Sequence, residues 1–313
     1  MDISIVVEWD NAASAAYDPA LDVLRALRSQ AADLILEGMT FEVLVIFAPE
    51  TCGEARLTAI RDALGPAQAG WTPRLVEAPR LTYYAMKNLG ARHASGDALV
   101  FLDSDVMPEP GWLARLARLI ARPGIPVACG STYLRHDSFS AKLLALIWLF
   151  PAPSAETSIG PARRVFANNL AIRREIFLAN PFPDSPGIYR GGCQLLVRRL
   201  REKGLVIYQD PQARVCHPVP SRLVRRALIS GRDGVLIARA GRSGWLETPL
   251  GALARPAYLL LRAWRAALCD FRLVGLSLAA VPAAMTLAAC YYGLHLAGGI
   301  ATHLNLRIEP ESQ

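Results

Sequence analysis

The stretch Ala98-Leu-Val-Phe-Leu-Asp-Ser-Asp-Val106, followed by Met107-Pro-Glu-Pro-Gly-Trp112, decides how the chain is interpreted. Ala98 to Leu102 is an unbroken apolar run, which predicts a short strand buried on both faces. The run ends in two carboxylates, Asp103 and Asp105. Ligands of an open parallel sheet sit outside the carboxyl ends of its strands, so two acids held there suit Mg²⁺ or Mn²⁺ carrying a phosphate. The alternative is a strand–turn–helix connection in which an Asp caps the helix.

The neighbouring residues favour the first interpretation. The chain has Tyr83-Tyr-Ala-Met-Lys-Asn-Leu-Gly-Ala-Arg-His-Ala-Ser-Gly-Asp97 before the strand and Pro108-Glu-Pro-Gly-Trp-Leu113 after it. This run, in order and with short gaps, resembles the family 2 glycosyltransferases of the GT-A fold. The resemblance extends, more thinly, from Ile3 to about His217. The matching residues are Ala85, Lys87, Asn88, Gly90, Ala94, Gly96, Asp97, Asp103, Asp105 and Pro108.

The order of apolar segments predicts an α/β fold, and the resemblance implies a Rossmann-like GT-A sheet, mostly parallel, with helices on both faces. The expected strands are residues 3–7, 41–47, 74–77, 98–102, 127–132 and 206–208, and a further strand ends at Val215-Cys-His-Pro218. The expected helices are residues 21–36, 56–64, 83–94, 112–121 and 194–203. Residues 139–150 are also apolar, and they are either a core helix or a helix that dips into a membrane. We place the catalytic domain at residues 1–220.

Composition limits the cellular setting. Hydrophobic residues make up 52% of the 313 residues, which is high for a soluble enzyme. Met1 to Val7 has the pattern of a strand, so we expect no cleaved signal peptide. The six cysteines are scattered and form no C-x-x-C pair, which argues against a zinc site and a disulfide framework and fits a reducing compartment.

Positive charge is concentrated in one segment. Residues 214–272 hold eleven Arg and no Lys against three acids, a net charge of +8, while the whole chain carries +7. Basic residues next to an apolar segment suggest an anionic membrane surface. Nucleic acid is the alternative partner, but no recognised binding motif accompanies the arginines, and we expect none to bind.

The basic segment, residues 221–272, shows two helical patterns with Arg on one side. Arg225, Arg232 and Arg239 are spaced by seven residues, and so are Arg255 and Arg262. An apolar face with an arginine stripe fits helices lying in a membrane interface. The alternative is a pair of ordinary amphipathic helices packed on the domain.

Residues 273–306 contain no Asp, Glu, Lys or Arg. About 20 apolar residues suffice to cross a bilayer, so we expect one transmembrane helix at Val274–Ile300, bent at Pro282, and a tail at 307–313. The arginines precede this helix, and the positive-inside rule then predicts a single-pass protein of the cytoplasmic membrane with its catalytic domain in the cytosol.

The resemblance implies roles for individual residues. Asp105 would hold the metal, and Asp103 would contact the ribose, the metal or a metal-bound water. His217 would be a further metal ligand, with a purely structural role as the alternative. Glu8 and Asp10 would contact the nucleoside, unless they are solvated loop acids. Lys87 and Asn88 would face the same crevice, with Lys87 on the diphosphate, unless both lie on the surface.

The chain departs from the family pattern at two places. Phe47-Ala-Pro-Glu50 replaces the end of the strand where the family has an Asp that reads the base. The family also carries a Glu-Asp pair just before a helix ending in R-L-x-x-x-G, and that Asp is the general base. The helix ending is present at Arg199 to Gly204, but the pair falls on Gly192-Cys193. Asp184 is the nearest upstream candidate for the base. The Gly-Gly-Cys turn could instead hold an anion.

We therefore expect an inverting glycosyltransferase (hexosyltransferase type) that moves one sugar from a nucleotide-sugar donor to a lipid-linked or cell-envelope acceptor. Gln194 to Arg198 lacks the Trp of the Q-x-x-R-W motif of processive synthases, so we expect a single transfer. The main alternative is a non-catalytic relative that binds nucleotide sugars or acts as a scaffold after losing the general base. A membrane adaptor without a nucleotide site is the third class.

Overall fold

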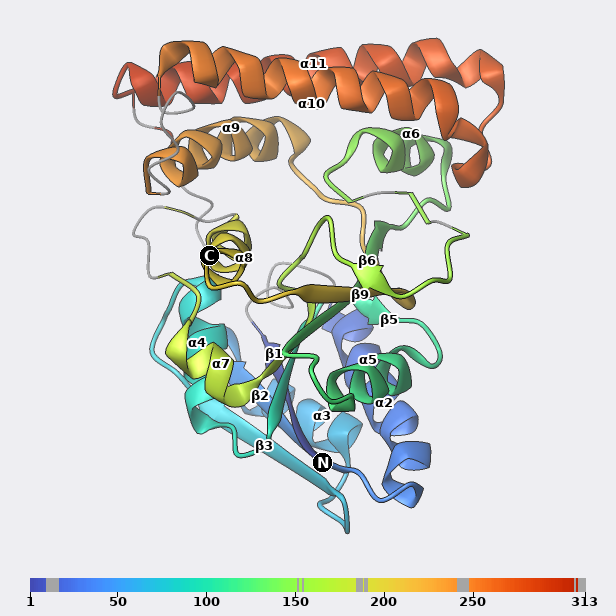
Figure 1. The fold of residues 1–313 in the computed structure, drawn as a ribbon, viewed down its shortest axis with the longest axis vertical. Coiled ribbons are helices and arrows are strands. Elements are labelled where there is room, and N and C mark those ends of the chain that lie inside the picture. Colours follow the sequence, from blue (N-terminus) through green and yellow to red (C-terminus); the bar gives the residue numbers. More distant parts are fainter. Residues whose placement is uncertain are drawn as a thin grey trace.

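The computed structural model describes residues 1–9, 17–150, 152–153, 155–183, 188, 191–240, 248–306 and 308. An α/β body fills the lower part of Figure 1, and a layer of helices lies across its upper end. The N-terminus is at the end of the body that is far from this helical layer.

The body is built on one mixed sheet with the strand order β3-β2-β1-β4-β8-β6-β9-β5, and β7 pairs with β9. The first four strands in this order are parallel, whereas β8 runs antiparallel to both β4 and β6. The strands are β1 (Asp2–Glu8), β2 (Thr40–Phe47), β3 (Trp71–Glu77), β4 (Ala98–Asp103), β5 (Met107–Pro108), β6 (Val127–Leu134), β7 (Gly160–Pro161), β8 (Asn169–Arg173) and β9 (Ile207–His217).

Helices cover both faces of the sheet because the inner strands are apolar on both sides. Ile5 of β1 points into the core beneath α2 (Tyr17–Leu36), α3 (Glu54–Leu64) and α5 (Trp112–Ala121). Val6, the next residue, points into the opposite core beneath α4 (Tyr83–His93), α7 (Arg174–Ala179) and α8 (Gly192–Glu202). Successive side chains of a strand alternate between faces, so one strand feeds both cores.

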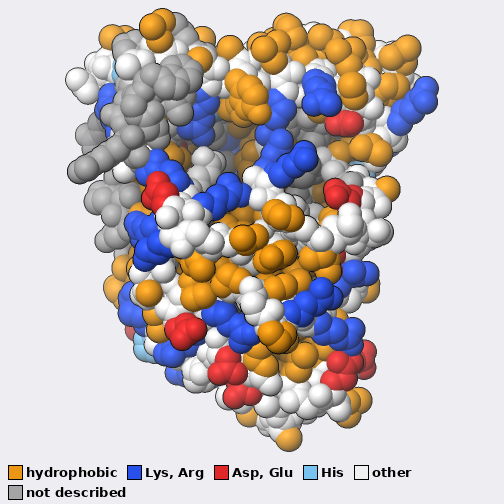
Figure 2. Space-filling view, viewed as in Figure 1, with side chains coloured by type: hydrophobic (Ala, Val, Ile, Leu, Met, Phe, Trp, Pro, Cys, Tyr) orange, Lys and Arg blue, Asp and Glu red, His pale blue; other side chains and the backbone are white. Residues whose placement is uncertain are grey.

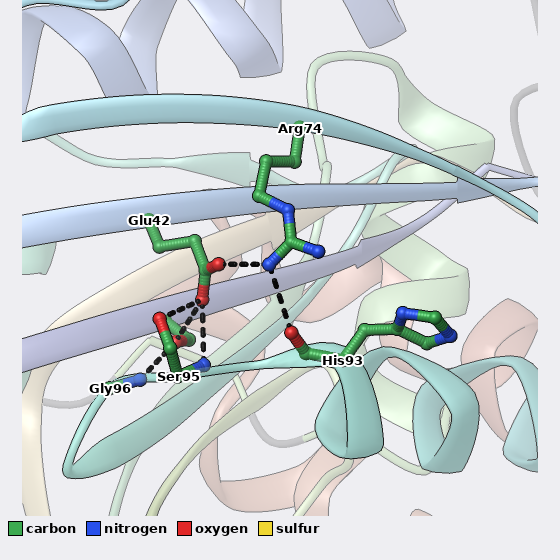
Figure 3. Close-up of polar contacts among 6 residues, drawn as sticks. Glu42, Arg74, His93, Ser95 and Gly96 are labelled. Atoms are coloured by element: carbon green, nitrogen blue, oxygen red, sulfur yellow. Dashed lines mark hydrogen bonds and ion pairs between the residues drawn. The ribbon is translucent and has the colours of Figure 1, made fainter.

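The ends of the strands far from the helical layer are joined by a polar network (Figure 3). Glu42 of β2 accepts hydrogen bonds from Ser4 Oγ at 2.7 Å and from Ser95 N at 2.9 Å, and it forms an ion pair with Arg74. Gly96 passes so close to β1 that a Cβ there would lie 2.8 Å from Ser4 N. The network therefore fixes the turn that leads from α4 into β4.

The helical layer consists of α6 (Phe139–Ile147), α9 (Leu223–Ala240), α10 (Pro249–Cys269) and α11 (Val281–His303). These helices share a third hydrophobic core. In Figure 1, α10 and α11 lie side by side, with α9 and α6 between them and the body. Residues 139–147 form a helix whose apolar side chains between Ala141 and Ile147 are buried, most of them in this core, whereas Phe139 is exposed. This burial agrees with the core-helix interpretation of that segment.

The structure corrects the prediction for the C-terminal apolar run. Short 3₁₀ turns at Phe271–Val274 and Leu278–Ala280 precede α11, which begins at Val281. Pro282 lies in the first turn of α11, where its missing N–H would have had no intrahelical partner, so it starts the helix and does not bend it.

The end of the catalytic region also differs from its prediction. One continuous strand, β9, replaces the two short strands expected around residues 207 and 216. The sequence suggested a break because Pro211 lies inside it. The pairing of β9 with β6 shifts register between Cys129 and Ser131, and this irregularity accommodates the proline.

Candidate active site

Two acidic residues meet at the carboxyl ends of neighbouring parallel strands. Glu8, the last residue of β1, is the register partner of Asp103, the last residue of β4, and both side chains are buried. Since β1 starts at the far end of the body, this edge of the sheet points towards the helical layer (Figure 1). Asp10, which was expected beside Glu8, lies outside the described residues.

Asp103 is held by two side chains of α4. Lys87 Nζ lies 2.7 Å from Asp103 Oδ1, and the Tyr83 hydroxyl donates to the carboxylate at 2.8 and 3.0 Å. Tyr83 and Lys87 are four residues apart and therefore share one helix face. The Lys87 ammonium also lies 4.8 Å from the centre of the Tyr83 ring. Burial, and then the charge of Asp103, raise the pKa of Tyr83, so its hydroxyl remains a donor.

The buried position of Lys87 changes its predicted role. Its side chain is fully buried, so it does not lie on the surface, and its ammonium is used by Asp103. A buried charge pair is retained only where each charge satisfies the other. In this structure Lys87 thus orients Asp103, and its contact with a diphosphate stays a prediction.

Asp105, two residues after Asp103, lies in a different environment from the Lys87–Asp103 ion pair. Its side chain is half-buried, and its Oδ1 is shielded from water without a hydrogen-bond partner among the described residues. Burial raises the pKa of Asp105, and Asp103 raises it further, while His217 and Arg226 oppose this effect. A shielded carboxylate oxygen without a partner costs about 1–3 kcal/mol. A cation at Oδ1 would remove that cost.

His217, at the end of β9, is oriented by the backbone. Its Nδ1 lies 2.7 Å from the Pro218 carbonyl oxygen, and its ring packs 5.1 Å from the Phe150 ring, centre to centre. Because a carbonyl oxygen can only accept, Nδ1 is the donor in this contact, and Nε2 is the ring nitrogen left for another partner. A histidine held in this way through Nδ1 can bind a metal through Nε2.

The residues fit a divalent cation that also carries a ligand. Among the described residues, no three or more His, Cys, Asp and Glu side chains gather closely enough to hold a metal. Asp105 and His217 would therefore supply few of its ligands, and phosphate oxygens and waters would supply the rest, as Mg²⁺ sites at nucleotides do. Asp103 is already engaged by Lys87 and Tyr83, whereas Asp105 Oδ1 has no hydrogen-bond partner among the described residues.

Asn88 does not face the site. Its Nδ2 donates to the Phe182 carbonyl oxygen at 2.9 Å, and its Oδ1 accepts from the Phe182 N–H at 3.0 Å. The donor and the acceptor of the Asn88 amide are thus both satisfied by the backbone of Phe182. In this structure the Asn88 amide therefore fastens Phe182, in the segment before α8, to α4, and its contact with a nucleotide stays a prediction.

The start of α8, where the family pattern places its acidic pair, has no carboxylate. Gly191 has a φ of 85°, and a Cβ on Gly192 would lie 2.7 Å from the Tyr84 ring. A longer side chain at residue 192 would therefore displace Tyr84. Burial raises the pKa of Cys193, so its thiol is a poor base. Asp184, the predicted base, lies outside the described residues.

Two residues at the site were missed by the sequence analysis. Tyr83 belongs to the stretch already quoted, and its spacing of four from Lys87 was the available signal. Arg226, in the first turns of α9, is close enough to Asp105 to lower the pKa of that carboxyl. Because Arg226 lies beyond residue 220, the predicted catalytic boundary cuts through the site.

The α/β fold of this chain is GT-A-like. Residues 22–177, just under half of the chain, match the family described as Glycosyl transferase family 2. A search of the curated proteins gave no match.

Two solved structures show the same fold. The first is the mannosyltransferase PcManGT from Pyrobaculum calidifontis in complex with GDP-Man and Mn²⁺, with 19% identity and a TM-score of 0.60 over 97% of this chain and 88% of that one. The second is GalNAc-T7 with UDP, GalNAc and Mn²⁺, with 14% identity and a TM-score of 0.54 over 78% of this chain and 51% of that one. Their identities are low, so the likeness is one of fold.

Proposed function

We propose that this protein transfers a sugar from a nucleotide-sugar donor in a reaction that depends on Mg²⁺ or Mn²⁺. The observation that carries the proposal is the pair at the carboxyl end of β4: Asp103 locked by Lys87, and Asp105 with an oxygen that lacks a partner among the described residues. The two structural neighbours hold Mn²⁺ together with GDP-Man or UDP, which supports the same ligand classes here.

Each residue of the site has a role in the proposed transfer. Glu8 and Asp103 accept hydrogen bonds from the nucleoside, whose hydroxyl groups are donors at this edge. Asp105 and His217 hold the divalent cation. When bound, the cation supplies Lewis-acid stabilisation to the departing diphosphate. Tyr83 and Lys87 hold Asp103 in one orientation, which lowers the cost of ordering the site.

The acceptor and the stereochemistry belong to the same proposal. We propose a single, inverting transfer to a lipid-linked or cell-envelope acceptor, with Asp184 as the base that takes the proton of the acceptor hydroxyl. The basic residues of 214–272 support attachment to the cytoplasmic membrane with the catalytic domain in the cytosol. The second candidate is a nucleotide-sugar-binding scaffold, which the Gly192-Cys193 departure favours.

Metal-dependent binding of a nucleotide sugar tests the proposed donor and cation site. We expect a nucleotide sugar to raise the melting temperature of the full chain with Mn²⁺ and to lose this effect with EDTA. Asp105→Asn should abolish the metal-dependent shift and lower turnover by roughly 10²–10³-fold. Asp62→Asn, an exposed acid of α3, is the matched control. A full shift in the Asp105→Asn protein would refute the assigned site.

The base requires a separate measurement. Asp184→Asn should abolish release of nucleoside diphosphate with acceptor and leave the metal-dependent thermal shift unchanged. Binding without turnover in the unmodified chain, across a panel of acceptors, would favour the scaffold over the enzyme.

A further inference from the structure

The outer surface of the helical layer is apolar. We call it the α10–α11 face and define it by the exposed side chains of Leu250, Tyr258, Leu261, Leu268, Leu278 and Ile300, which are 41–73% exposed. Figure 2 shows hydrophobic side chains gathered along the upper edge of the molecule, where Figure 1 places α10 and α11. Contiguous apolar surface of this kind marks an interaction site on a water-soluble protein.

Positive charge predominates at this face. Residues 248–306 contain four Arg and a single acid, Asp270, and no Lys or Glu. Two of the arginines, Arg255 and Arg262, donate inward to Gly234 O and Trp148 O. Arg265 and Arg272 are exposed, and both lie near Leu268 in the sequence. Apolar side chains flanked by arginines are complementary to a bilayer with anionic headgroups, in which the apolar groups enter the acyl boundary and the guanidinium groups stay with the phosphates.

The packing of α11 argues that it does not cross a bilayer. Leu278–His303 is the one described segment long and apolar enough to do so, by length and composition. However, α11 is attached along its length. Near its start, Met285 O accepts from Trp264 Nε1 of α10 at 3.0 Å, and at its middle the Tyr292 hydroxyl donates to Ile147 O of α6 at 2.7 Å.

The C-terminal half of α11 is attached as closely. A Cβ on Gly298 would lie 2.0 Å from Leu228 O of α9, and one on Gly231 would lie 1.8 Å from His295 O. Arg232 and Asp233 are buried in α9 beside this contact. A bilayer core is about 30 Å thick, close to the roughly 35 Å length of a 23-residue helix. Crossing it would take α11 away from α6 or carry the charged α9 into hydrocarbon.

We propose that the α10–α11 face lies in the plane of an anionic bilayer and that α11 enters it sideways without spanning it. A second copy of the chain fits this face less well. Two such faces in contact would bring the arginines of both copies together with only Asp270 as an acid on each. The proposal is independent of the sugar-transfer chemistry, because it concerns the opposite side of the helical layer from Asp103 and Asp105.

The proposal places the membrane on the far side of the helical layer from the site. The carboxyl ends of β1 and β4 point towards the helical layer, and β9 leads from His217 to α9. A bilayer on the α10–α11 face would thus lie beyond the layer that covers the site.

Vesicle flotation tests the docking surface. We expect the full chain to float with vesicles of phosphatidylcholine and phosphatidylglycerol in equal parts and less with phosphatidylcholine alone. The double variant Leu261→Glu and Leu268→Glu should lower the partition coefficient roughly tenfold or more. Leu36→Glu, at an 88% exposed leucine of α2, is the matched control and should float like the unmodified chain.

Two flotation results would overturn the proposal: no binding to either kind of vesicle, or equal binding by the double variant and the unmodified chain. A stable dimer in the absence of vesicles, which the double variant converts to monomer, would also overturn it. Circular dichroism and cooperative thermal unfolding, measured on every variant without ligand, establish that each is folded. The Mn²⁺-dependent shift with nucleotide sugar can fail while flotation succeeds, so the two proposals are tested separately.

Topology distinguishes lying in the bilayer from crossing it. We place one epitope tag at each end of the full chain and add protease to sealed membrane vesicles from the expression host. The in-plane arrangement predicts that both tags are digested from the same side. Digestion of the two tags from opposite sides would show a spanning helix and overturn the proposal.

Discussion

At the residue scale, the site depends on one buried ion pair. Lys87 and Asp103 lie in different elements, and each removes the desolvation penalty of the other. Tyr83 adds a third partner, so the carboxylate has a single orientation at the mouth of the site. This arrangement explains why a lysine predicted to contact substrate is fully buried.

The first prediction concerns this pair. Lys87→Met should leave the Asp103 charge buried without its cation and destabilise the fold by about 3–5 kcal/mol. Urea unfolding gives the change in the free energy of unfolding. Arg92→Met, at an exposed position of the same helix, is the control and should change it by less than about 0.5 kcal/mol. Equal stability of the two variants would contradict the assignment.

The second residue-scale prediction separates orientation from charge. Tyr83→Phe keeps the ring next to Lys87 and removes only the hydroxyl that donates to Asp103. We expect a loss of about 1.5–3 kcal/mol in stability or nucleotide binding, because the lost hydrogen bond is to a charged group. Calorimetric titration with a nucleotide sugar and Mn²⁺ measures it. Unchanged affinity and unchanged melting together would refute the role of Tyr83.

At the element scale, two features hold secondary structure in register. One is the Glu42 network in Figure 3, which ties β1, β2 and β3 to the turn before β4. The other is the crossing of α9 and α11, where Gly231 and Gly298 let the two backbones approach. The residues of both features lie outside the catalytic motifs.

The Glu42 network predicts a pH dependence of stability. Burial alone would raise the pKa of Glu42, but the hydrogen bonds from Ser4, Ser95 and Arg74 together hold it below its ordinary value of 4.5. A group with a lowered native pKa stabilises the fold above its unfolded pKa, and this contribution is lost as pH falls through the native value.

Glu42→Gln therefore should lower stability most at neutral pH. We expect a loss of about 1–3 kcal/mol at pH 7, and the difference from the unmodified chain should narrow as the pH falls below about 4.5. Urea unfolding across this range measures it. A difference that stays constant with pH would contradict the lowered pKa.

The helix crossing gives a matched pair of glycine substitutions within α11. Gly298→Ala places a Cβ 2.0 Å from the α9 backbone and should destabilise the fold by about 1–3 kcal/mol. Gly293→Ala meets nothing within 4 Å and should stabilise the helix by up to about 1 kcal/mol. Thermal unfolding of the two variants should move in opposite directions, and a common direction would refute the crossing.

At the scale of the whole molecule, the helical layer and the body are not separable. The buried face of α6, with Leu143, Leu144 and Ile147, belongs to the same core as α10 and α11. Arg226 of α9 also acts on Asp105. The predicted division at residue 220 marks a change in composition, and the shared core predicts that the two parts do not fold independently.

Truncation tests this unity. A chain ending at residue 220 should expose the α6 core face and aggregate, whereas a chain ending at residue 308 should remain folded. Light scattering and circular dichroism after purification compare the two. A monomeric, cooperatively unfolding 1–220 chain would show that the layer is an independent addition.

The sequence by itself determined the part of the fold that rests on local pattern. The apolar strand 98–102, the acids after it and the helix of Tyr83 were predicted because burial on both faces gives an unbroken hydrophobic run and because short-range spacing sets a helix face. The position of Glu8 beside Asp103 followed from strand ends that meet at one edge.

Only the tertiary structure decided which side chains pair. Three such pairs are Lys87 with Asp103, Asn88 with Phe182, and Arg226 with Asp105. Their members lie up to 121 residues apart in the sequence. Spacing along the chain carries no information about contacts over such separations. The attachment of α11 was likewise decided by packing. An apolar helix of 23 residues has the same composition whether hydrocarbon or other helices cover it.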